Sequence, residues 1–239
     1  MTLLSLGLAL LVNTAAAQTK PSASDRKVAI VELAGLGLEN KLIRAFESYL
    51  ERSIGTIDGI STISTIDVDI ARQDPRNSKY RDCGGGTRAR ISCAAGLGKL
   101  VGADLAIYGT IGAIGGSYSV NLRAVDVVQV KEVIKYTKTI SGSRDRLIPA
   151  VRLAAFELVA PEKITGTLKI EIDVAGVVVE IDGKEVGTTP LAESSATLSP
   201  GPHVVVLRRP GFKEFQREFE IKPFETAKLK LELELLQRD

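Results

Sequence analysis

The chain has 239 residues, 44% of them hydrophobic and 25% charged, which is ordinary globular composition and enough sequence for two modest domains. Such a composition excludes a disordered chain. Thirty-one Lys and Arg against 29 Asp and Glu leave a net charge of +2, too close to balance for the strong positive field that drives non-specific nucleic-acid binding. We therefore expect no nucleic-acid partner.

Residues 1–17, MTLLSLGLALLVNTAAA, have the pattern of a secretory signal peptide. They carry no charged side chain and end in small residues, with cleavage expected before Gln18, although the usual basic n-region is missing. The alternative, a membrane anchor, needs about 20 apolar residues, and neither this run nor any later one is that long. No Cys follows the run, so the attachment residue of a lipoprotein is lacking. We expect an exported protein, periplasmic or extracellular, with no stable membrane span in the mature chain.

A strand and an amphipathic helix open the mature chain. Lys27–Leu33 is a short apolar run rich in β-branched residues, which indicates a buried strand. Apolar residues at spacings of three and four, with charged residues between them, then predict a helix: Leu42, Ile43, Phe46, Leu50 and Ile54. A second, weaker strand is expected over 59–65. An exposed loop or short helical turn is expected from Asp67 to Gly86.

The chain has two cysteines, Cys83 and Cys93. An oxidising compartment favours joining them, and the closed loop is worth about 2 to 3 kcal/mol in the chain-entropy model. The competing interpretation is a metal pair. A zinc site, however, needs four ligands at short spacings, and the only histidine, His203, is far away in the sequence. We expect a disulfide that closes the base of the loop.

The clearest β region of the first half follows a predicted short helix over 91–101. Leu105–Ile114 is apolar, and Gly115-Gly116 signals a two-residue hairpin turn, because both positions of a type I′ turn need positive φ. The next residues alternate between apolar and polar, which indicates a strand with one face on a core. A third strand over 132–140 and a closing helix over 147–158 complete the predicted region.

This order of elements, over about Lys27 to Val159, resembles the TolB amino-terminal and CsgG-like domains of bacterial envelope proteins. The resemblance is carried by the segment Cys93–Asp104, by Tyr-Gly-Thr at 108–110, and by the Gly115-Gly116-Ser-Tyr turn with Asp126 beyond it. Gln129-Val130 stands where a Gly-containing turn is usual, and no β-propeller repeat follows, so the chain is not a complete TolB. The resemblance implies an α/β domain with a mixed sheet and flanking helices over residues 25–160.

After a linker at 160–166 the apolar period becomes two. Short alternating strands are separated by turn pairs such as Asp182-Gly183, Pro200-Gly201 and Pro210-Gly211, and the last predicted strand runs from Ala227 to Leu235. This pattern predicts a small antiparallel β-sandwich over residues 167–236.

The same residues resemble a PEGA domain. The motifs fall in family order: Ile181-Asp-Gly-Lys184, Val186-Gly187, Thr189-Pro-Leu191, Ser199-Pro-Gly-Pro-His203, Pro210-Gly-Phe212 and Lys222-Pro223. The name-giving tetrad is replaced by Val174-Ala-Gly-Val177, and Phe224 stands where Gly is common. Members of this family are extracytoplasmic, non-catalytic modules appended to other domains, which agrees with the export signal.

The residue types present do not suggest a catalytic or metal site. His203 is the candidate general base, but it begins a strand just after a Pro-Gly turn, so we assign it a structural role. The run Gly96-Leu-Gly-Lys99 lacks the first Gly and the Ser or Thr of a phosphate loop. Asp67, Asp69 and Asp74 lack the Gly and distal Glu of an EF-hand loop. We expect no metal, no cofactor and no enzymatic activity.

Residues 72–90, here called the basic segment, contain six basic side chains against two acidic ones, Asp74 and Asp82. The plain interpretation is an ordinary solvated loop, and the alternative is a surface that meets an anionic partner. It is the best local site candidate in the sequence, and its basic residues are Arg72, Arg76, Lys79, Arg81, Arg88 and Arg90.

The sequence therefore predicts an α+β protein: an N-terminal α/β domain with a mixed sheet, followed by a small all-β antiparallel sandwich. We expect an exported, non-catalytic envelope interaction or assembly protein that binds envelope proteins or cell-wall components. The alternative is an accessory or regulatory subunit of a secretion or cell-wall synthesis complex. An enzyme in its own right ranks third, because no nucleophile, base and orienting group can be assembled from the residue types present.

Overall fold

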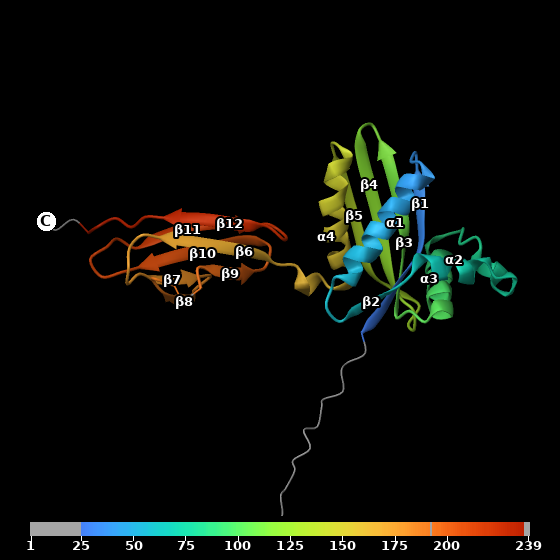
Figure 1. The fold of residues 1–239 in the computed structure, drawn as a ribbon, viewed down its shortest axis with the longest axis horizontal. Coiled ribbons are helices and arrows are strands. Elements are labelled where there is room, and N and C mark those ends of the chain that lie inside the picture. Colours follow the sequence, from blue (N-terminus) through green and yellow to red (C-terminus); the bar gives the residue numbers. More distant parts are fainter. Residues whose placement is uncertain (1–24, 192, 237–239) are drawn as a thin grey trace, which may run out of the picture.

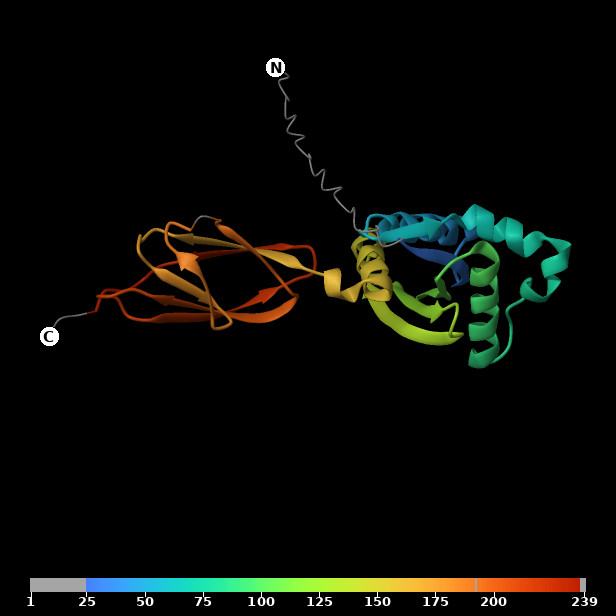
Figure 2. The ribbon, with the colours of Figure 1, turned by 90° about the horizontal axis from the view of Figure 1, so that it is seen from below.

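The computed structural model describes residues 25–191 and 193–236, so the predicted signal peptide at 1–17 lies outside the described residues. Two regions lie end to end along the long axis, one of helices and strands and one of strands alone (Figures 1 and 2). Each has its own hydrophobic core. Within the described part of the chain, no helix has the length and apolar character needed to cross a membrane.

The N-terminal region is an α/β layer structure. Its strands and helices are β1 (Arg26–Leu36), α1 (Asn40–Gly55), β2 (Ile60–Ile63), α2 (Thr65–Gln73), η1 (Pro75–Tyr80), α3 (Thr87–Val101), β3 (Leu105–Ile114), β4 (Ser117–Asp126), β5 (Lys131–Ser141), η2 (Arg144–Arg146), α4 (Leu147–Val159) and η3 (Pro161–Lys163). The sheet order is β2-β1-β3-β4-β5, with β2, β1 and β3 parallel and β3, β4 and β5 antiparallel. The predicted mixed sheet with flanking helices is confirmed.

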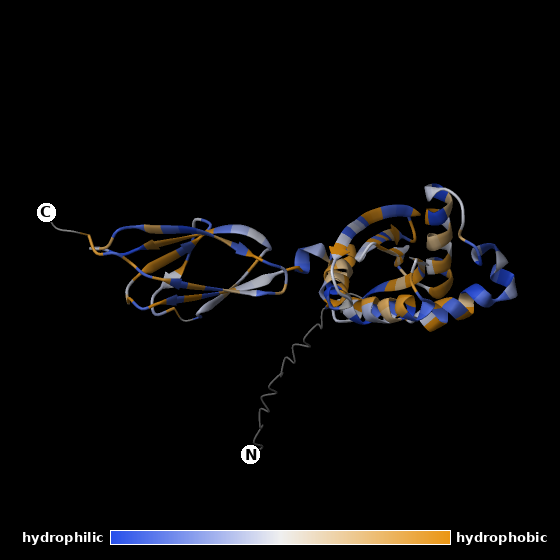
Figure 3. Cartoon of the chain, turned by 90° about the horizontal axis from the view of Figure 1, so that it is seen from above, coloured by the Kyte–Doolittle hydropathy of each residue, from blue (hydrophilic) through white to orange (hydrophobic). Residues whose placement is uncertain are grey.

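Apolar residues on both faces of β1 place this strand in the middle of two cores. Val28 and Ile30 join the larger cluster, where α1 and α4 pack on the sheet, and Ala29 and Val31 join a second cluster under α3. Strands of this kind read as continuous apolar runs because helices cover both faces. Figure 3 shows hydrophobic residues concentrated along α4 and the central strands, whereas the outer segment around η1 is mostly hydrophilic.

The stretch from Asp67 to Gly86 is predicted to be an exposed loop or a short helical turn, and the loop alternative is wrong for its first half, which is helical in α2 and η1. Ser64 caps a helix there, because its side-chain oxygen accepts a hydrogen bond from the backbone N–H of Ile66 at 3.1 Å. Val68 is then buried in the cluster under α3. The predicted helix at 91–101 also begins earlier, at Thr87.

The two turns of the β3–β4–β5 meander are built differently. Gly115 and Gly116 both have positive φ, at 57° and 78°, as the predicted hairpin requires. The β4–β5 turn has no glycine, and Asp126 organises it instead, since its Oδ1 accepts hydrogen bonds from the backbone N–H groups of Val128 at 3.0 Å and Gln129 at 2.7 Å. Val130 takes the left-handed conformation that a glycine would otherwise supply.

The C-terminal region is a sandwich of two sheets. Its strands are β6 (Gly166–Ile172), β7 (Val178–Ile181), β8 (Lys184–Thr188), β9 (Ser195–Leu198), β10 (Gly201–Arg208), β11 (Phe215–Ile221) and β12 (Thr226–Leu231). One sheet has the order β11-β10-β7-β8 and the other β12-β6-β9. All pairs are antiparallel except β6 with β12, the first and last strands, which run parallel. The all-β region after a mixed α/β region is as predicted, and this parallel pair is a detail that the turn signals did not indicate.

Candidate functional site

The basic segment is fixed to α3 at two points. The Cα atoms of Cys83 and Cys93 lie 5.6 Å apart and their side chains are joined, an arrangement compatible with the predicted disulfide. Three residues earlier, the Tyr80 side chain contacts α3 at Gly96, where an added Cβ would come within 2.3 to 2.6 Å of Tyr80 side-chain atoms. Gly96 therefore permits a close approach between η1 and α3. This contact explains why α3 contains a glycine here, although glycine is unfavourable inside a helix.

Arg72 and Arg90, two of the six predicted site residues, make contacts within the fold. Arg72 donates a hydrogen bond through Nη2 to the carbonyl oxygen of Val31, and its Nε is buried without a hydrogen-bond partner among the described residues. The guanidinium of Arg90 lies 5.4 Å from the centre of the Tyr108 ring. These two side chains bridge the helices to the sheet, so the basic segment presents fewer charges than its composition indicates.

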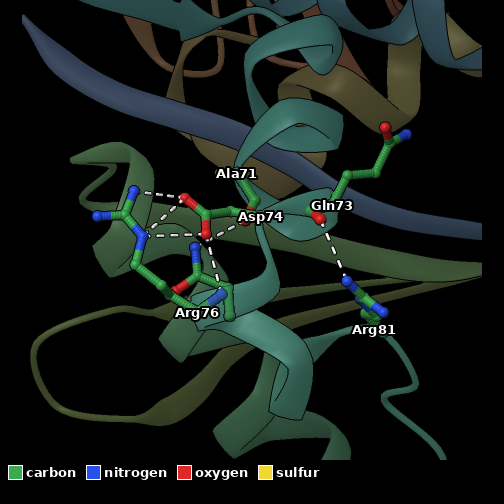
Figure 4. Close-up of polar contacts among 6 residues, drawn as sticks. Ala71, Gln73, Asp74, Arg76 and Arg81 are labelled. Atoms are coloured by element: carbon green, nitrogen blue, oxygen red, sulfur yellow. Dashed lines mark hydrogen bonds and ion pairs between the residues drawn. The ribbon is translucent and has the colours of Figure 1, made fainter.

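Arg76 is exposed but already paired (Figure 4). Its Nη2 lies 2.5 Å from Oδ2 of Asp74, and its Nε donates to both carboxylate oxygens at 3.0 and 3.1 Å. Asp74 also caps η1, accepting from the backbone N–H of Arg76 at 2.9 Å. The hydrogen bonds from the Arg76 side chain and backbone lower the pKa of Asp74 to about 2, so this carboxylate stays charged at all ordinary pH and offsets the Arg76 charge.

The remaining basic residues are more available to a partner. Arg81 donates to the carbonyl of Gln73 at 3.3 Å, and Figure 4 places its guanidinium on the opposite side of the α2–η1 turn from that of Arg76. The Lys79 ammonium lies 4.8 Å from the centre of the Tyr80 ring, and Arg88 is exposed at the start of α3. The structure thus separates the six residues into an exposed group, with Lys79, Arg81 and Arg88 as its available charges, and an inward pair.

A charged cleft beside the basic segment was not predicted. It has a volume of about 400 Å³ and lies between α1, α2 and β1, with Arg44, Glu47, Asp69 and Arg72 on its walls. Nη1 of Arg44 lies 3.1 Å from Asp69 and 3.7 Å from Glu47. Burial raises the pKa of Glu47, an effect that the nearby Arg44 charge partly opposes. Arg44 and Glu47 lie on the predicted helix, whereas Asp69 lies in the stretch predicted to be an exposed loop or a short helical turn. The sequence therefore does not bring these two walls of the cleft together.

His203 does not act as a free base. Its Nδ1 lies 2.6 Å from Oδ2 of Asp182 and its Nε2 lies 2.8 Å from the carbonyl oxygen of Ser199, so both ring nitrogens meet acceptors. The hydrogen bond that His203 donates to the Asp182 carboxylate is the main cause that raises the pKa of His203. The other oxygen of Asp182 accepts from the backbone N–H of Val204 at 2.9 Å. The imidazole is held as a structural link between the β7–β8 turn and β10.

The remaining ligand-like patterns are also used by the fold. The run from Gly96 to Lys99 lies inside α3, so its backbone N–H groups are committed to the helix and not to a phosphate. Asp69 and Asp74 each face an arginine, and Asp67 lies in the first turn of α2. Over residues 25–191 and 193–236 no three His, Cys, Asp or Glu side chains gather as a metal site would require.

A family model described as the PEGA domain matches residues 165–237. Residues 165–237 form a PEGA domain. Thr189, in the Thr-Pro motif, is buried and fixes the segment that replaces the name-giving tetrad. Its Oγ1 accepts from the backbone N–H of Val177 at 2.9 Å and donates to the carbonyl of Val174 at 2.6 Å. The tetrad segment is therefore held in place although its sequence has changed.

Solved structures with some similarity come from several bacterial proteins. The C-terminal domain of LpoB from Salmonella enterica has 16% identity and a TM-score of 0.37, covering 52% of this chain and 88% of that one. TolB from Acinetobacter baumannii has 11% identity and a TM-score of 0.39, covering 83% of this chain and 51% of TolB. The PelC dodecamer from Paraburkholderia phytofirmans has 14% identity and a TM-score of 0.32, covering 56% of this chain and 89% of that one.

Similarity this weak does not assign a partner or an activity to the chain. A search of curated proteins finds no match. The PEGA domain is therefore the one family assignment, and the resemblance of the N-terminal region to TolB amino-terminal and CsgG-like domains stays a prediction.

Proposed function

We propose that this protein is exported to the periplasm or the cell exterior, where it binds envelope proteins or cell-wall components without catalysis. The observation that carries the proposal is the basic segment, an exposed, hydrophilic element held on α3 at Cys83–Cys93 and at Tyr80. A segment fixed in this way loses less conformational entropy on binding than a free loop of the same length. The PEGA domain supports the same role, as a non-catalytic module joined to a second region.

The contacts refine which residues take part. Arg72 and Arg90 serve the fold, and the charge of Arg76 is offset by Asp74, so Lys79, Arg81 and Arg88 are the charges left for an anionic partner. His203 is bonded at both nitrogens and supports the sandwich. We infer that binding at this surface depends on steered charge contacts and is sensitive to salt.

The test is a crosslinked pull-down from envelope fractions with the triple variant Arg76→Ser, Lys79→Ser and Arg81→Ser. Capture of partners should weaken and its salt dependence should flatten, with the melting temperature little altered, because exposed substitutions cost within about 0.5 kcal/mol. Arg76→Ser alone should weaken capture less than the triple variant, because it removes one charge and leaves the Asp74 carboxylate without its cation. The matched comparison is Lys79→Ser with Arg81→Ser against Lys228→Ser with Lys230→Ser on β12, since each double variant removes two exposed charges. If the triple variant captures partners at low salt as well as the wild type does, the basic segment is an ordinary solvated loop and not a binding surface.

A further inference from the structure

A groove lies where the N-terminal region meets the PEGA domain. It has a volume of about 700 Å³ and runs between the first half of α4, the end of β5 and the β11–β12 loop. Its apolar surface comes from residues such as Tyr49, Ile148, Pro149 and Phe224. Ile148 is 53% exposed, which is unusual for an isoleucine on the first turn of a packed helix. Grooves of this size and lining are typical of binding sites.

The charges around this groove are almost all positive. Lys138, Arg146, Arg152 and Lys222 line it, against the single carboxylate of Glu225. None of these four cations forms an ion pair within 4.0 Å with any residue that the structure describes. In a chain with a net charge of only +2, four unpaired cations around one apolar groove favour an anionic occupant.

Phe224 forms the wall that the PEGA domain contributes. Its φ is +61°, a conformation that costs a residue with a side chain about 1 to 2 kcal/mol and costs glycine nothing. Its ring centroid lies 4.8 Å from that of Phe156 on α4, and the Arg152 guanidinium lies 4.4 Å from the ring centre. A strained aromatic residue is kept here because its ring packs on the neighbouring region.

The linker is tied to the same loop, so the two walls of the groove are connected. The backbone N–H of Phe224 donates to the carbonyl of Thr165 at 2.8 Å, and the N–H of Thr167 donates to the carbonyl of Glu225 at 2.9 Å. These bonds hold the β11–β12 loop beside the chain that leaves α4. The groove therefore depends on the packing of the two regions against each other.

The free edge of the sheet adds main-chain recognition. β5 is the last strand in the order β2-β1-β3-β4-β5, and its residues Lys138–Ser141 line the groove. In the described part of the chain no further strand pairs with β5 on its outer side. An edge strand of this kind takes up an extended peptide through backbone hydrogen bonds, and flanking side chains select its sequence.

We propose that the junction groove binds an extended acidic segment of a partner protein, with carboxylates facing Lys138, Arg146, Arg152 and Lys222 and one aromatic or aliphatic side chain on Ile148 and Pro149. The concave shape and the strand edge favour a peptide over a flat membrane surface. The proposal does not rest on the basic segment, because different residues form the two surfaces.

The test uses the full chain and a fluorescently labelled synthetic peptide of alternating Glu and Phe, with a Lys and Phe peptide as its charge-reversed counterpart. The Glu peptide should bind and the Lys peptide should not. Lys138→Ser with Arg146→Ser should weaken binding about tenfold or more. Lys228→Ser with Lys230→Ser and Lys79→Ser with Arg81→Ser, which remove the same charge elsewhere, should leave it unchanged. Equal loss in either control pair would overturn the proposal, since the attraction would then be unspecific.

Phe224→Gly separates binding from folding. Glycine adopts the same backbone without strain, so the melting temperature of the PEGA domain should hold or rise while peptide affinity falls with the loss of the wall. If Phe224→Gly binds the peptide with full affinity, the Phe224 wall of the junction groove does not contribute to binding and the proposal is contradicted.

Vesicles containing anionic phosphatidylglycerol test whether the groove binds a membrane surface instead of a peptide. If they bind through Lys138 and Arg146 while the peptide does not, the surface belongs to a membrane and the peptide proposal is wrong.

Discussion

One glycine from each region, Gly183 in the PEGA domain and Gly109 in the N-terminal region, is present for a different physical reason. Gly183 of the PEGA domain has a φ of +78° and open space around it, so it is present for its backbone conformation. Gly109, on β3 of the N-terminal region, has no unusual φ, but a Cβ there would lie 2.1 Å from the carbonyl oxygen of Asn121 on β4. A glycine of the first kind can be predicted from the sequence as part of a turn. The need for a glycine of the second kind depends on the residues that pack against it, which the sequence does not show.

Of the substitutions that test this comparison, Gly109→Ala should lower the free energy of unfolding the most. The added methyl meets the backbone oxygen of Asn121 and the Cα of Leu122, neither of which can move without displacing β4. Overpacking of this kind costs typically 1 to 3 kcal/mol, and we expect about 3 kcal/mol here. The matched variant is Gly183→Ala, which meets no atom and should cost only about 1 kcal/mol of backbone strain.

The two variants are compared in the full chain by hydrogen exchange and mass spectrometry, which reports on the two regions separately. Gly109→Ala should lower protection in β3 and β4 and leave the PEGA domain unchanged, and Gly183→Ala should do the reverse more weakly. Equal costs for the two substitutions would show that close approach at Gly109 and turn geometry at Gly183 do not differ in their contribution to stability.

The predicted disulfide sharpens the comparison, because only the N-terminal region contains one. Replacing Cys83 and Cys93 by Ser should lower the free energy of unfolding of this region by about 2 to 3 kcal/mol, since the closed loop no longer restricts the unfolded chain. The PEGA domain should keep its exchange protection. Before reduction, mass spectrometry should find both thiols of the wild-type protein protected from alkylation. Two free thiols would rule out the disulfide, and the serine variant should then lose much less stability.

The PEGA domain was the more predictable of the two regions because its signals are local. Alternating residues, paired turn residues and family motifs all lie within a few positions of the structure they specify. The predicted Asp182-Gly183 turn joins β7 to β8, and both of its residues have positive φ. Its parallel pairing of β6 with β12 was missed, since it joins residues about 60 positions apart and leaves no local pattern.

In the N-terminal region the errors arise where packing decides. For helix α2 the sequence predicts only an exposed loop or a short helical turn, because the one buried residue, Val68, gives no periodic stripe. The basic segment was identified from composition, but composition does not reveal that Arg72 turns inward to Val31 or that Asp74 offsets Arg76. The sequence does not predict the junction groove, because the walls of the groove come from two regions that are predicted as separate domains.

The smallest expected effect is a pH dependence confined to the PEGA domain. Asp182 raises the pKa of His203, so the folded state holds that proton more tightly than the unfolded state, whose imidazole has a pKa of about 6.5. The stability contributed by this pair is fully present below that value and is lost as the pH rises through the higher folded pKa. His203 in turn lowers the pKa of Asp182, so the contribution is also lost as the pH falls below the usual carboxylate range.

Because His203 is the only histidine in the chain, a loss of stability as the pH rises above about 6.5 is assigned to one side chain. Hydrogen exchange at a series of pH values, corrected for the intrinsic exchange rate, should show protection in β7 and β10 that declines toward alkaline pH. The N-terminal region, which contains no histidine, should not change over the same interval. His203→Gln keeps a hydrogen-bonding side chain without the titration, so its PEGA domain should be less stable at pH 6 and nearly flat with pH. A wild-type profile that is equally flat would mean that the contact with Asp182 holds a neutral imidazole.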